Sequence, residues 1–143
     1  MKREEWILLA ADCAENGSLS PIQLQKSLFL LSQKYPNEVG EGFYEFKPYN
    51  YGPFDKEIYS DCIVLAQQGF LVVQQPIGQS WTRYSVTRTG IEYAKRLEKK
   101  ASKDAREYLC QIVKWIQGLT FCELLTAIYN AFPEFKKDSV FQE

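Results

Sequence analysis

One short stretch, residues 70–86, constrains the fold most, because it has the pattern of a β-hairpin inside an otherwise helical sequence. The runs 70–75 and 81–86 are rich in β-forming residues, and 76–80 supplies the proline, glycine and serine of a turn. A two-stranded hairpin is only marginally stable in water, so its apolar face must pack on helices. We expect that face to consist of Leu71, Val73, Tyr84 and Val86.

Helical periodicity fills most of the sequence on either side of this hairpin. Ser20 and Thr120 each precede an apolar run and are followed three residues later by Gln23 and Glu123, the pattern of a capping box at a helix start. Thr87 is expected to cap a further helix directly after the hairpin. The expected helices are about 3–15, 20–35, 56–68, a segment that begins at 87, 102–117 and 120–132, followed by a loosely packed tail at 134–143.

Residues 43–54 differ from the rest of the chain because they are dense in aromatic rings. The segment holds six aromatic residues in twelve, and its two prolines exclude a regular helix. We expect an extended aromatic arm that turns sharply at Gly52 and Pro53, with Phe46 and Phe54 in the core. Tyrosines suit interfaces because they give a large contact area at a low entropy cost. The candidates for contact with a protein partner are Tyr44, Tyr49 and Tyr59, and the residues expected to set the conformation of the arm are Tyr51, Gly52, Pro53 and Phe54.

The order of these elements predicts a mainly α-helical protein with a small β-hairpin, arranged as a winged helix-turn-helix domain. The winged-helix domain is expected to cover residues 1–100, with the arm at 43–54 and the hairpin at 70–86 as its wing. Residues 101–143 then supply two C-terminal helices, which either pack back on the domain or form a dimer interface. In a winged helix the helix before the wing usually reads DNA, and here that helix is 56–68.

The composition argues against catalysis. The chain contains no histidine, which removes Ser-His-Asp and Cys-His mechanisms and the commonest general base near neutral pH. The sequence has no glycine-rich phosphate loop, and no carboxylate pair has the spacing or apolar setting of a catalytic one. We therefore expect no enzymatic activity, no cofactor, no metal site and no small-molecule substrate.

The cysteines and the N-terminus indicate a cytoplasmic protein. Cys13, Cys62, Cys110 and Cys122 occupy apolar positions of helical patterns, and the closest two are twelve residues apart. We expect them to be unpaired, buried side chains in a reducing compartment. The N-terminus lacks the apolar core of a signal peptide, and no apolar run reaches the ~20 residues that a membrane span requires.

Positive charge is concentrated in one part of the chain. Residues 83–106 carry eight basic and three acidic residues, whereas the whole chain has a net charge of −1 and a pI of about 5.6. Such a strip along the wing and the next helix can contact phosphates, but it is also the pattern of a solvated helix face. The reader helix 56–68 opposes DNA binding, because its expected exposed face carries more acids than lysines. The candidate nucleic-acid-binding residues are Arg83, Arg88, Lys95, Lys99, Lys103 and Lys56.

Three short motifs follow one another along the first half of the chain. They are Leu24-Gln25-Lys26 in a helix, the turn Tyr51-Gly52-Pro53-Phe54, and a following helix with Tyr59, Asp61, Leu65 and Gly69. Over about residues 22–90 the chain thereby resembles the YwgA-like proteins and is similar to the Panacea, or SocA-type, antitoxin domain. The Panacea pattern includes a histidine that this chain lacks, which favours the YwgA-like group. The resemblance implies a small bacterial or phage-type regulatory or antitoxin-like module with no known enzymatic activity.

Together these features predict a non-enzymatic regulatory module that binds a macromolecule. We favour a protein partner because the aromatic arm suits an interface, and the resemblance to antitoxins implies that this partner is toxin-like. A DNA-binding transcription regulator that uses the wing and the basic strip 83–106 is the alternative. A homodimer would present two such strips to one duplex.

Overall fold

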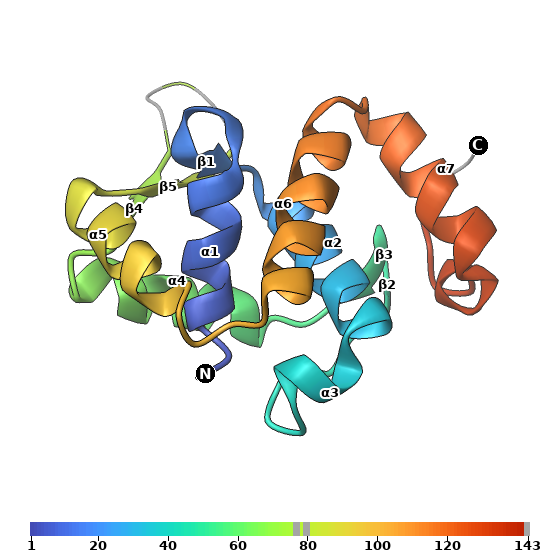
Figure 1. Cartoon of the computed structure of the whole chain (residues 1–143). Helices are drawn as coiled ribbons and strands as arrows, with labels where there is room; N and C mark the ends of the chain where they lie inside the picture. Colours follow the sequence, from blue (N-terminus) through green and yellow to red (C-terminus); the bar gives the residue numbers. More distant parts are fainter. Residues whose placement is uncertain (76–77, 79–80, 142–143) are drawn as a thin grey trace.

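The protein is mainly helical and carries two small antiparallel sheets, as seen in a computed structural model that describes residues 1–75, 78 and 81–141 (Figure 1). The α-helices are α1 (Glu5–Cys13), α2 (Pro21–Lys34), α3 (Pro36–Val39), α4 (Glu57–Gln67), α5 (Arg88–Leu97), α6 (Lys103–Gln117) and α7 (Phe121–Ala131). The strands are β1 (Ser18–Leu19), β2 (Lys47–Tyr49), β3 (Gly52–Phe54), β4 (Leu71–Gln74) and β5 (Arg83–Val86). Short 3-10 helices, η1 (Glu15–Gly17) and η2 (Pro133–Lys136), complete these elements. The predicted mainly α-helical class with a small β-hairpin is confirmed.

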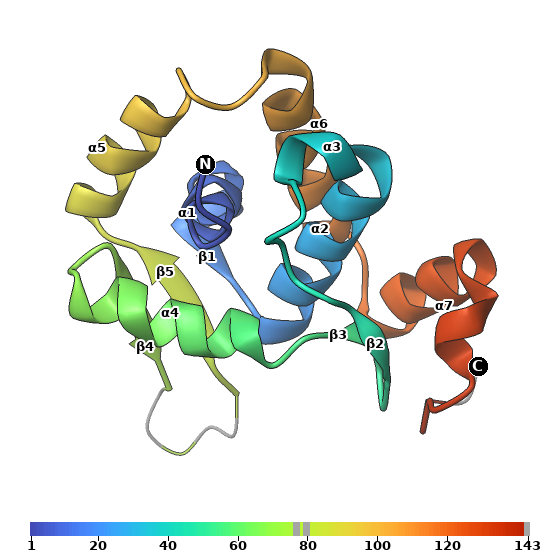
Figure 2. The same cartoon turned by 90° about the horizontal axis from the view of Figure 1, so that it is seen from below.

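Helices α1, α2 and α6 form the centre of the molecule. Figure 2 shows α4, β4, β5 and α5 on one side of them, which we call the hairpin end, and β2, β3 and α7 on the other, which we call the arm end. Helix α6 packs against both α1 and α2, so it completes the central core. Helix α2 is buried on nearly all sides: Leu24 and Leu28 are fully inaccessible, and the polar Gln25 and Lys26 are only 1% and 2% exposed.

The predicted hairpin is present. Strands β4 and β5 pair antiparallel with Leu71 opposite Val86 and Val73 opposite Tyr84. The predicted turn lies outside the described residues, apart from Gly78. Leu71 and Tyr84 are buried and Val86 packs on the core, but the prediction for Val73 is wrong, because it is 42% exposed near the free end of the edge strand.

A third strand joins this sheet, which local sequence patterns did not reveal. Strand β1 has only two residues and pairs with β5, so the strand order is β1-β5-β4. Next to the sheet, α5 approaches the β4 end so closely that only glycine fits at Gly90. A Cβ atom there would lie 2.2 Å from the carbonyl oxygen of Phe70.

The predicted helix starts are confirmed where capping residues marked them. The Ser20 and Thr120 hydroxyls accept hydrogen bonds from the backbone amides of Gln23 and Glu123. The side chains of Gln23 and Glu123 in turn accept from the backbone amides of Ser20 and Thr120, which completes two capping boxes. Thr87 accepts from the Gly90 amide at the start of α5. The short helix α3, which begins directly after Tyr35, was not predicted.

The aromatic arm folds back on itself, which corrects the predicted single extended segment. Strands β2 and β3 form a second antiparallel ladder, in which Tyr49 lies opposite Gly52. The reversal therefore falls at Asn50 and Tyr51, and not at Gly52 and Pro53 as predicted. Gly52 adopts a φ of +93°, a conformation that favours glycine.

The chain beyond α7 contacts the core through Phe135 and Phe141, while most of its other side chains up to residue 141 are exposed. The predicted loose packing of the tail is therefore corrected only at these two aromatic residues. The ring of Phe135 meets the buried ring of Phe29 edge-on, with centroids 4.9 Å apart. Further along, the Val140 amide donates to the Asn50 carbonyl at 3.0 Å. The tail thus ties α7 to the turn of the arm.

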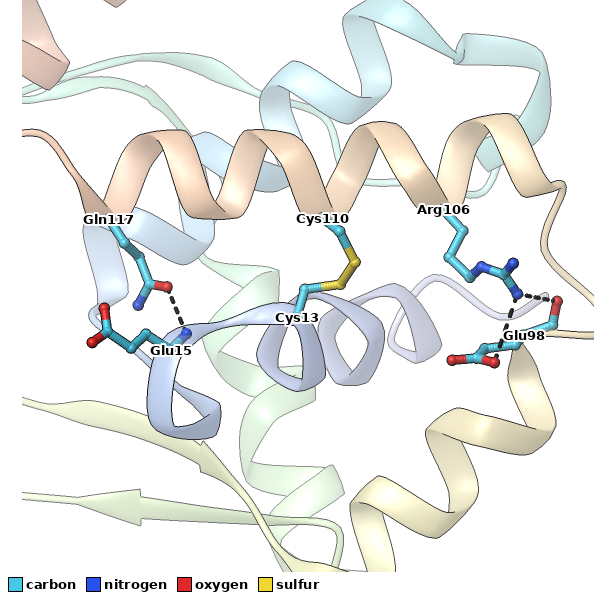
Figure 3. The surroundings of a disulfide bond; sticks show 6 residues. All are labelled: Cys13, Glu15, Glu98, Arg106, Cys110 and Gln117. Atoms are coloured by element: carbon cyan, nitrogen blue, oxygen red, sulfur yellow. Dashed lines mark hydrogen bonds and ion pairs between the residues drawn. A yellow bond between two sulfur atoms is a disulfide. The ribbon is translucent and has the colours of Figure 1, made fainter.

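A disulfide between Cys13 and Cys110 joins α1 to α6, which corrects the expectation of four unpaired thiols (Figure 3). Beside it the Glu15 amide donates to the Gln117 side chain at 2.8 Å. Cys62 is buried as expected, and burial raises the pKa of its thiol to about 12, so it is unreactive. Cys122 is exposed, contrary to the prediction.

Among the described residues, no helix has both the length and the apolar character needed to cross a membrane.

Candidate functional site

Two polar side chains of α2 hold the aromatic arm in place. The Gln25 amide nitrogen donates to the Asp55 carbonyl at 2.8 Å, and the Gln25 amide oxygen accepts from the Asp55 backbone amide at 3.1 Å. Gln25 therefore satisfies both backbone groups of Asp55, as a paired strand would. Because Gln25 is buried, loss of either bond would leave a polar group without water as a substitute partner.

Lys26 fixes the next part of the arm. Its ammonium nitrogen donates to the Pro53 carbonyl at 3.0 Å. The positive φ of Gly52 favours glycine there, whereas a Cβ atom would make ordinary van der Waals contact, at 3.5 Å, with Lys26 Cε and the Tyr129 ring. Burial lowers the pKa of Lys26 to about 7. We call Gln25, Lys26 and their bonds to the arm the clamp.

Asp55 links the arm to α4. Its carboxylate accepts from the Glu57 amide at 2.9 Å at the helix start and from the Glu45 amide at 2.8 Å. Asp55 was expected to cap the third helix, but the N-cap of α4 is Lys56, and Asp55 lies one residue before it. The clamp and Asp55 together determine where the aromatic rings of β2 and β3 lie.

These rings form the wall of a small pocket. Tyr49 stacks on Phe54 with centroids 4.7 Å apart, and Tyr59 meets Phe54 edge-on at 5.7 Å. On the opposite wall Tyr51 meets Phe121, from the first turn of α7, edge-on at 5.4 Å. The pocket has a volume of about 230 Å³ and is lined by Pro21, Ile22, Gln25, Lys26, Tyr49, Tyr51, Phe54, Tyr59 and Phe121.

The pocket opens into a wider hollow that reaches the turn end of the hairpin, where β5 begins. This hollow has a volume of about 900 Å³ and is lined by Ser20, Pro21, Ile22, Tyr51, Trp81, Thr82, Arg83 and Phe121. Four of these residues also line the pocket, so the two spaces form one continuous surface, which we call the aromatic groove. None of the described residues that line either part is an aspartate or a glutamate. Four large aromatic side chains along it are between 44% and 51% exposed: Tyr49, Tyr51, Trp81 and Phe121.

The structure places the three predicted contact tyrosines differently. Tyr49 is exposed at the groove and Tyr59 lies half-buried in its wall. Tyr44 is buried and outside the groove, because its hydroxyl donates to Asp61 at 2.6 Å, and Arg3 donates to the same carboxylate at 2.8 Å. Tyr44 is therefore a structural residue and not a surface contact. Phe46 and Phe54, expected in the core, are each half-buried.

The predicted basic residues do not gather at the groove. Arg83 does line it, and donates to the Ser18 hydroxyl at 2.8 Å and to the Ser18 carbonyl at 3.2 Å. The remaining candidates lie elsewhere. Arg88 is 4.0 Å from Glu92, Lys95 is exposed on α5, and Lys99 is exposed in the turn after α5. Lys103 is 3.9 Å from Glu107 at the start of α6, and Lys56 lies in a separate hollow with four carboxylates.

The outer face of α4, the predicted reader helix, is apolar and not basic. Ile63 and Val64 are 55% and 45% exposed, and Glu57–Gln67 contains no lysine or arginine. Asp61, one of the acids of this helix, is half-buried and accepts a hydrogen bond from Arg3. Negative charge on this face is therefore smaller than expected, yet α4 itself carries no cation for a phosphate, and its exposed polar side chains are those of Ser60 and Gln67.

Gln25, Lys26, Trp81 and Phe121 were not predicted as site residues. One signal was available for the first two: they belong to the Leu-Gln-Lys motif, in a helix of fourteen residues with only two charged side chains. No local pattern brings Phe121 to Tyr51, because they come from elements far apart in the chain. Among the described residues, no group of three or more histidine, cysteine or acidic side chains could hold a metal ion.

No protein-family model matches this sequence, and a comparison with curated proteins likewise finds no match.

Proposed function

We propose that this protein is a non-enzymatic interaction module of the winged-helix type that binds a protein partner through the aromatic groove. The winged-helix assignment is supported by the order α1, β1, α2, α4, β4, β5 and by the sheet order β1-β5-β4, in which the hairpin is the wing. Helix α6 and the disulfide then make the C-terminal helices part of the same body.

A single observation carries the proposed function: four exposed aromatic side chains line one continuous groove. Tyrosine, tryptophan and phenylalanine dominate the energetics of protein interfaces when they lie together in a pocket. Here the clamp holds the arm with buried hydrogen bonds, so the rings of β2 and β3 are positioned before any partner arrives. Such preorganisation reduces the ordering cost of binding.

The resemblance to YwgA-like and Panacea proteins fits the same surface. The Leu-Gln-Lys and Tyr-Gly-Pro motifs that carry the resemblance are joined by the Lys26–Pro53 bond and lie beside the groove. A toxin-like protein is therefore the kind of partner we propose. The absence of histidine and the engagement of Lys26 with a backbone carbonyl support a non-enzymatic role.

DNA binding through the wing and the strip 83–106 is the second candidate. It is favoured by exposed lysines on α5 and in the turn that follows it, of which Lys95 and Lys99 are examples. The apolar outer face of α4 opposes it, since a recognition helix needs polar side chains to read base edges. Binding that weakens steeply with salt and is lost in a Lys95→Glu/Lys99→Glu variant would support DNA binding.

The proposed compartment is the cytosol, where a disulfide is unusual. Trapping free thiols in intact cells and measuring the oxidised fraction of Cys13 and Cys110 tests this assignment. A fully oxidised pair at steady state would contradict a reducing compartment.

Site-specific photo-crosslinking tests the proposed function directly. A benzoylphenylalanine replaces Tyr51 in the groove, and in a matched control it replaces Trp115, a tryptophan on α6 that is 46% exposed and does not line the groove. We expect one protein to crosslink in native cells from position 51 and not from position 115. Equal crosslinking from both positions, or crosslinking to nucleic acid alone, would contradict the proposal.

A further inference from the structure

The two parts of the aromatic groove differ in size and in openness to solvent. Sites for small molecules usually have volumes of about 300–1,000 Å³ and bury most of the ligand. The inner pocket, at about 230 Å³, is smaller than that and has the size of one large side chain. The outer hollow, at about 900 Å³, is broad and open, and it continues from the pocket through Tyr51 and Phe121. This geometry fits a chain that inserts one side chain and lays its neighbours along the hollow.

The charges along the groove are of one sign. Arg83 lines the outer hollow, and Lys26 lines the inner pocket, while the described lining residues include no carboxylate. The two bonds to Ser18 use part of the Arg83 guanidinium and hold its plane in a fixed orientation. A guanidinium fixed in this way is suited to bind a carboxylate with its remaining N–H groups. Charge complementarity therefore favours an occupant with an acidic group.

We propose that the aromatic groove binds a short, extended peptide segment of the partner that places one aromatic or large aliphatic side chain in the inner pocket and an acidic side chain on Arg83. This inference rests on the proposed function and specifies the chemistry of its partner. Tyr49, Tyr51 and Phe121 surround the apolar side chain, and Arg83 recognises the carboxylate.

A single-stranded nucleic acid fits the groove less well than a peptide does. Stacked aromatic rings can hold bases, but each nucleotide also brings a phosphate that needs a nearby cation. Among the described lining residues, Arg83 is the one cation of the outer hollow and is partly buried, whereas the Lys26 amine is buried and bonded to Pro53.

Selection from a display library of short random peptides on the intact protein tests the proposal. We expect the selected peptides to share one aromatic or leucine residue and a nearby aspartate or glutamate. Affinities of synthetic peptides, measured by isothermal titration calorimetry, should fall by about tenfold or more in Tyr51→Ala and in Phe121→Ala, and stay unchanged in Trp115→Ala.

A double-mutant cycle isolates the role of Arg83. Binding should weaken when the acidic residue of the peptide is changed to its amide, and also in the Arg83→Met variant. The two changes together should weaken binding no more than either one alone. Circular dichroism and urea unfolding of Arg83→Met establish that the variant is folded. Additive effects would overturn the assignment of the carboxylate to Arg83.

Three further outcomes would overturn the inference. These are an enrichment without any shared pattern, peptide binding that survives Tyr51→Ala and Phe121→Ala, and tighter binding of single-stranded oligothymidylate through the same residues. If photo-crosslinking at position 51 identifies a protein whose short segments do not bind, this inference fails while the proposed function stands.

Discussion

The hairpin end and the arm end both contain a two-stranded antiparallel ladder, but different interactions hold the two ladders. At the hairpin end, β5 pairs with strands on both sides, and Leu71 and Tyr84 bury their side chains in the main core. At the arm end, β2 and β3 pair only with each other, and side chains of α2 bond to the backbone around β3. The first ladder depends on local pattern and core packing, whereas the second depends on two polar residues distant in sequence.

The largest expected effect comes from removing the disulfide that ties the central helices of the two ends together. Helix α1 packs on α5 and helix α6 packs on α2, and Cys13–Cys110 closes a loop with a sequence separation of 97. A loop of that length predicts a loss of about 4 kcal/mol in the free energy of unfolding for Cys13→Ser/Cys110→Ser. Urea unfolding measures this loss, and Cys122→Ser, an exposed cysteine, is the control that should change little. Equal free energies of unfolding for the two variants would contradict a stabilising role of the disulfide.

Gln25→Ala should weaken the arm end by about 3 kcal/mol, because it leaves both backbone groups of Asp55 without their buried partner. The control is Gln33→Ala, an exposed glutamine on the same helix, which should change the free energy of unfolding by less than about 0.5 kcal/mol. Hydrogen exchange at β2 and β3 should also rise in Gln25→Ala, while exchange at β4 and β5 stays unchanged. Faster exchange at both ladders would mean that the two ends are not independent.

Gly90→Ala tests the hairpin end with an effect of about 2 kcal/mol, since the added methyl group would meet the Phe70 carbonyl at 2.2 Å. Gly42→Ala is the matched control, because no atom lies within 4 Å of the position its Cβ would take. Thermal unfolding should show a clear loss for the first variant only. A Gly90→Ala protein as stable as Gly42→Ala would show that α5 is free to move away from β4.

The smallest expected effect is a change with pH, and it belongs to the arm end. The pKa of Lys26 is lowered to about 7 in the folded protein, so between pH 7 and the ordinary pKa of a lysine the unfolded chain binds more protons than the folded one. The free energy of unfolding therefore rises with pH in this range. The stabilities of the wild type and Lys26→Met should therefore diverge between pH 6 and pH 8, with the wild type gaining about 1 kcal/mol relative to the variant. Urea unfolding at both pH values measures this gain. Lys34→Met, an exposed lysine at the end of α2, should follow the wild type.

The sequence predicted the hairpin end well because its signals are local. The cap at Thr87 acts over three residues, and the alternation of β5 is visible without knowledge of any neighbour. The caps at Ser20 and Thr120, which lie outside the hairpin end, were predicted for the same reason. The prediction that Val73 belongs to the packed face was wrong, because the exposure of its side chain depends on which strand lies at the edge of the sheet, and β4 lies there. Strand β1 was missed because two residues carry no periodic pattern.

The arm end could not be predicted in the same way. The aromatic density of residues 43–54 and the Tyr-Gly-Pro motif marked the segment, but the partners of its backbone lie in α2. A buried lysine contradicts ordinary burial preferences, so composition argued against placing Lys26 inside. The Cys13–Cys110 pair and the packing of Phe135 likewise depend on how α6 and the tail return to the core.

The most direct test of the central claim uses the partner protein that crosslinking identifies. Its affinity is measured for two variants, one altered in the aromatic groove and one in the basic strip. Tyr51→Ala/Phe121→Ala changes the groove, and Lys95→Glu/Lys99→Glu changes the basic strip. If the groove is the binding surface, partner affinity falls by about tenfold or more in the first variant and stays within about twofold of the wild type in the second. A loss confined to the basic-strip variant, with the groove variant binding like the wild type, would contradict the account.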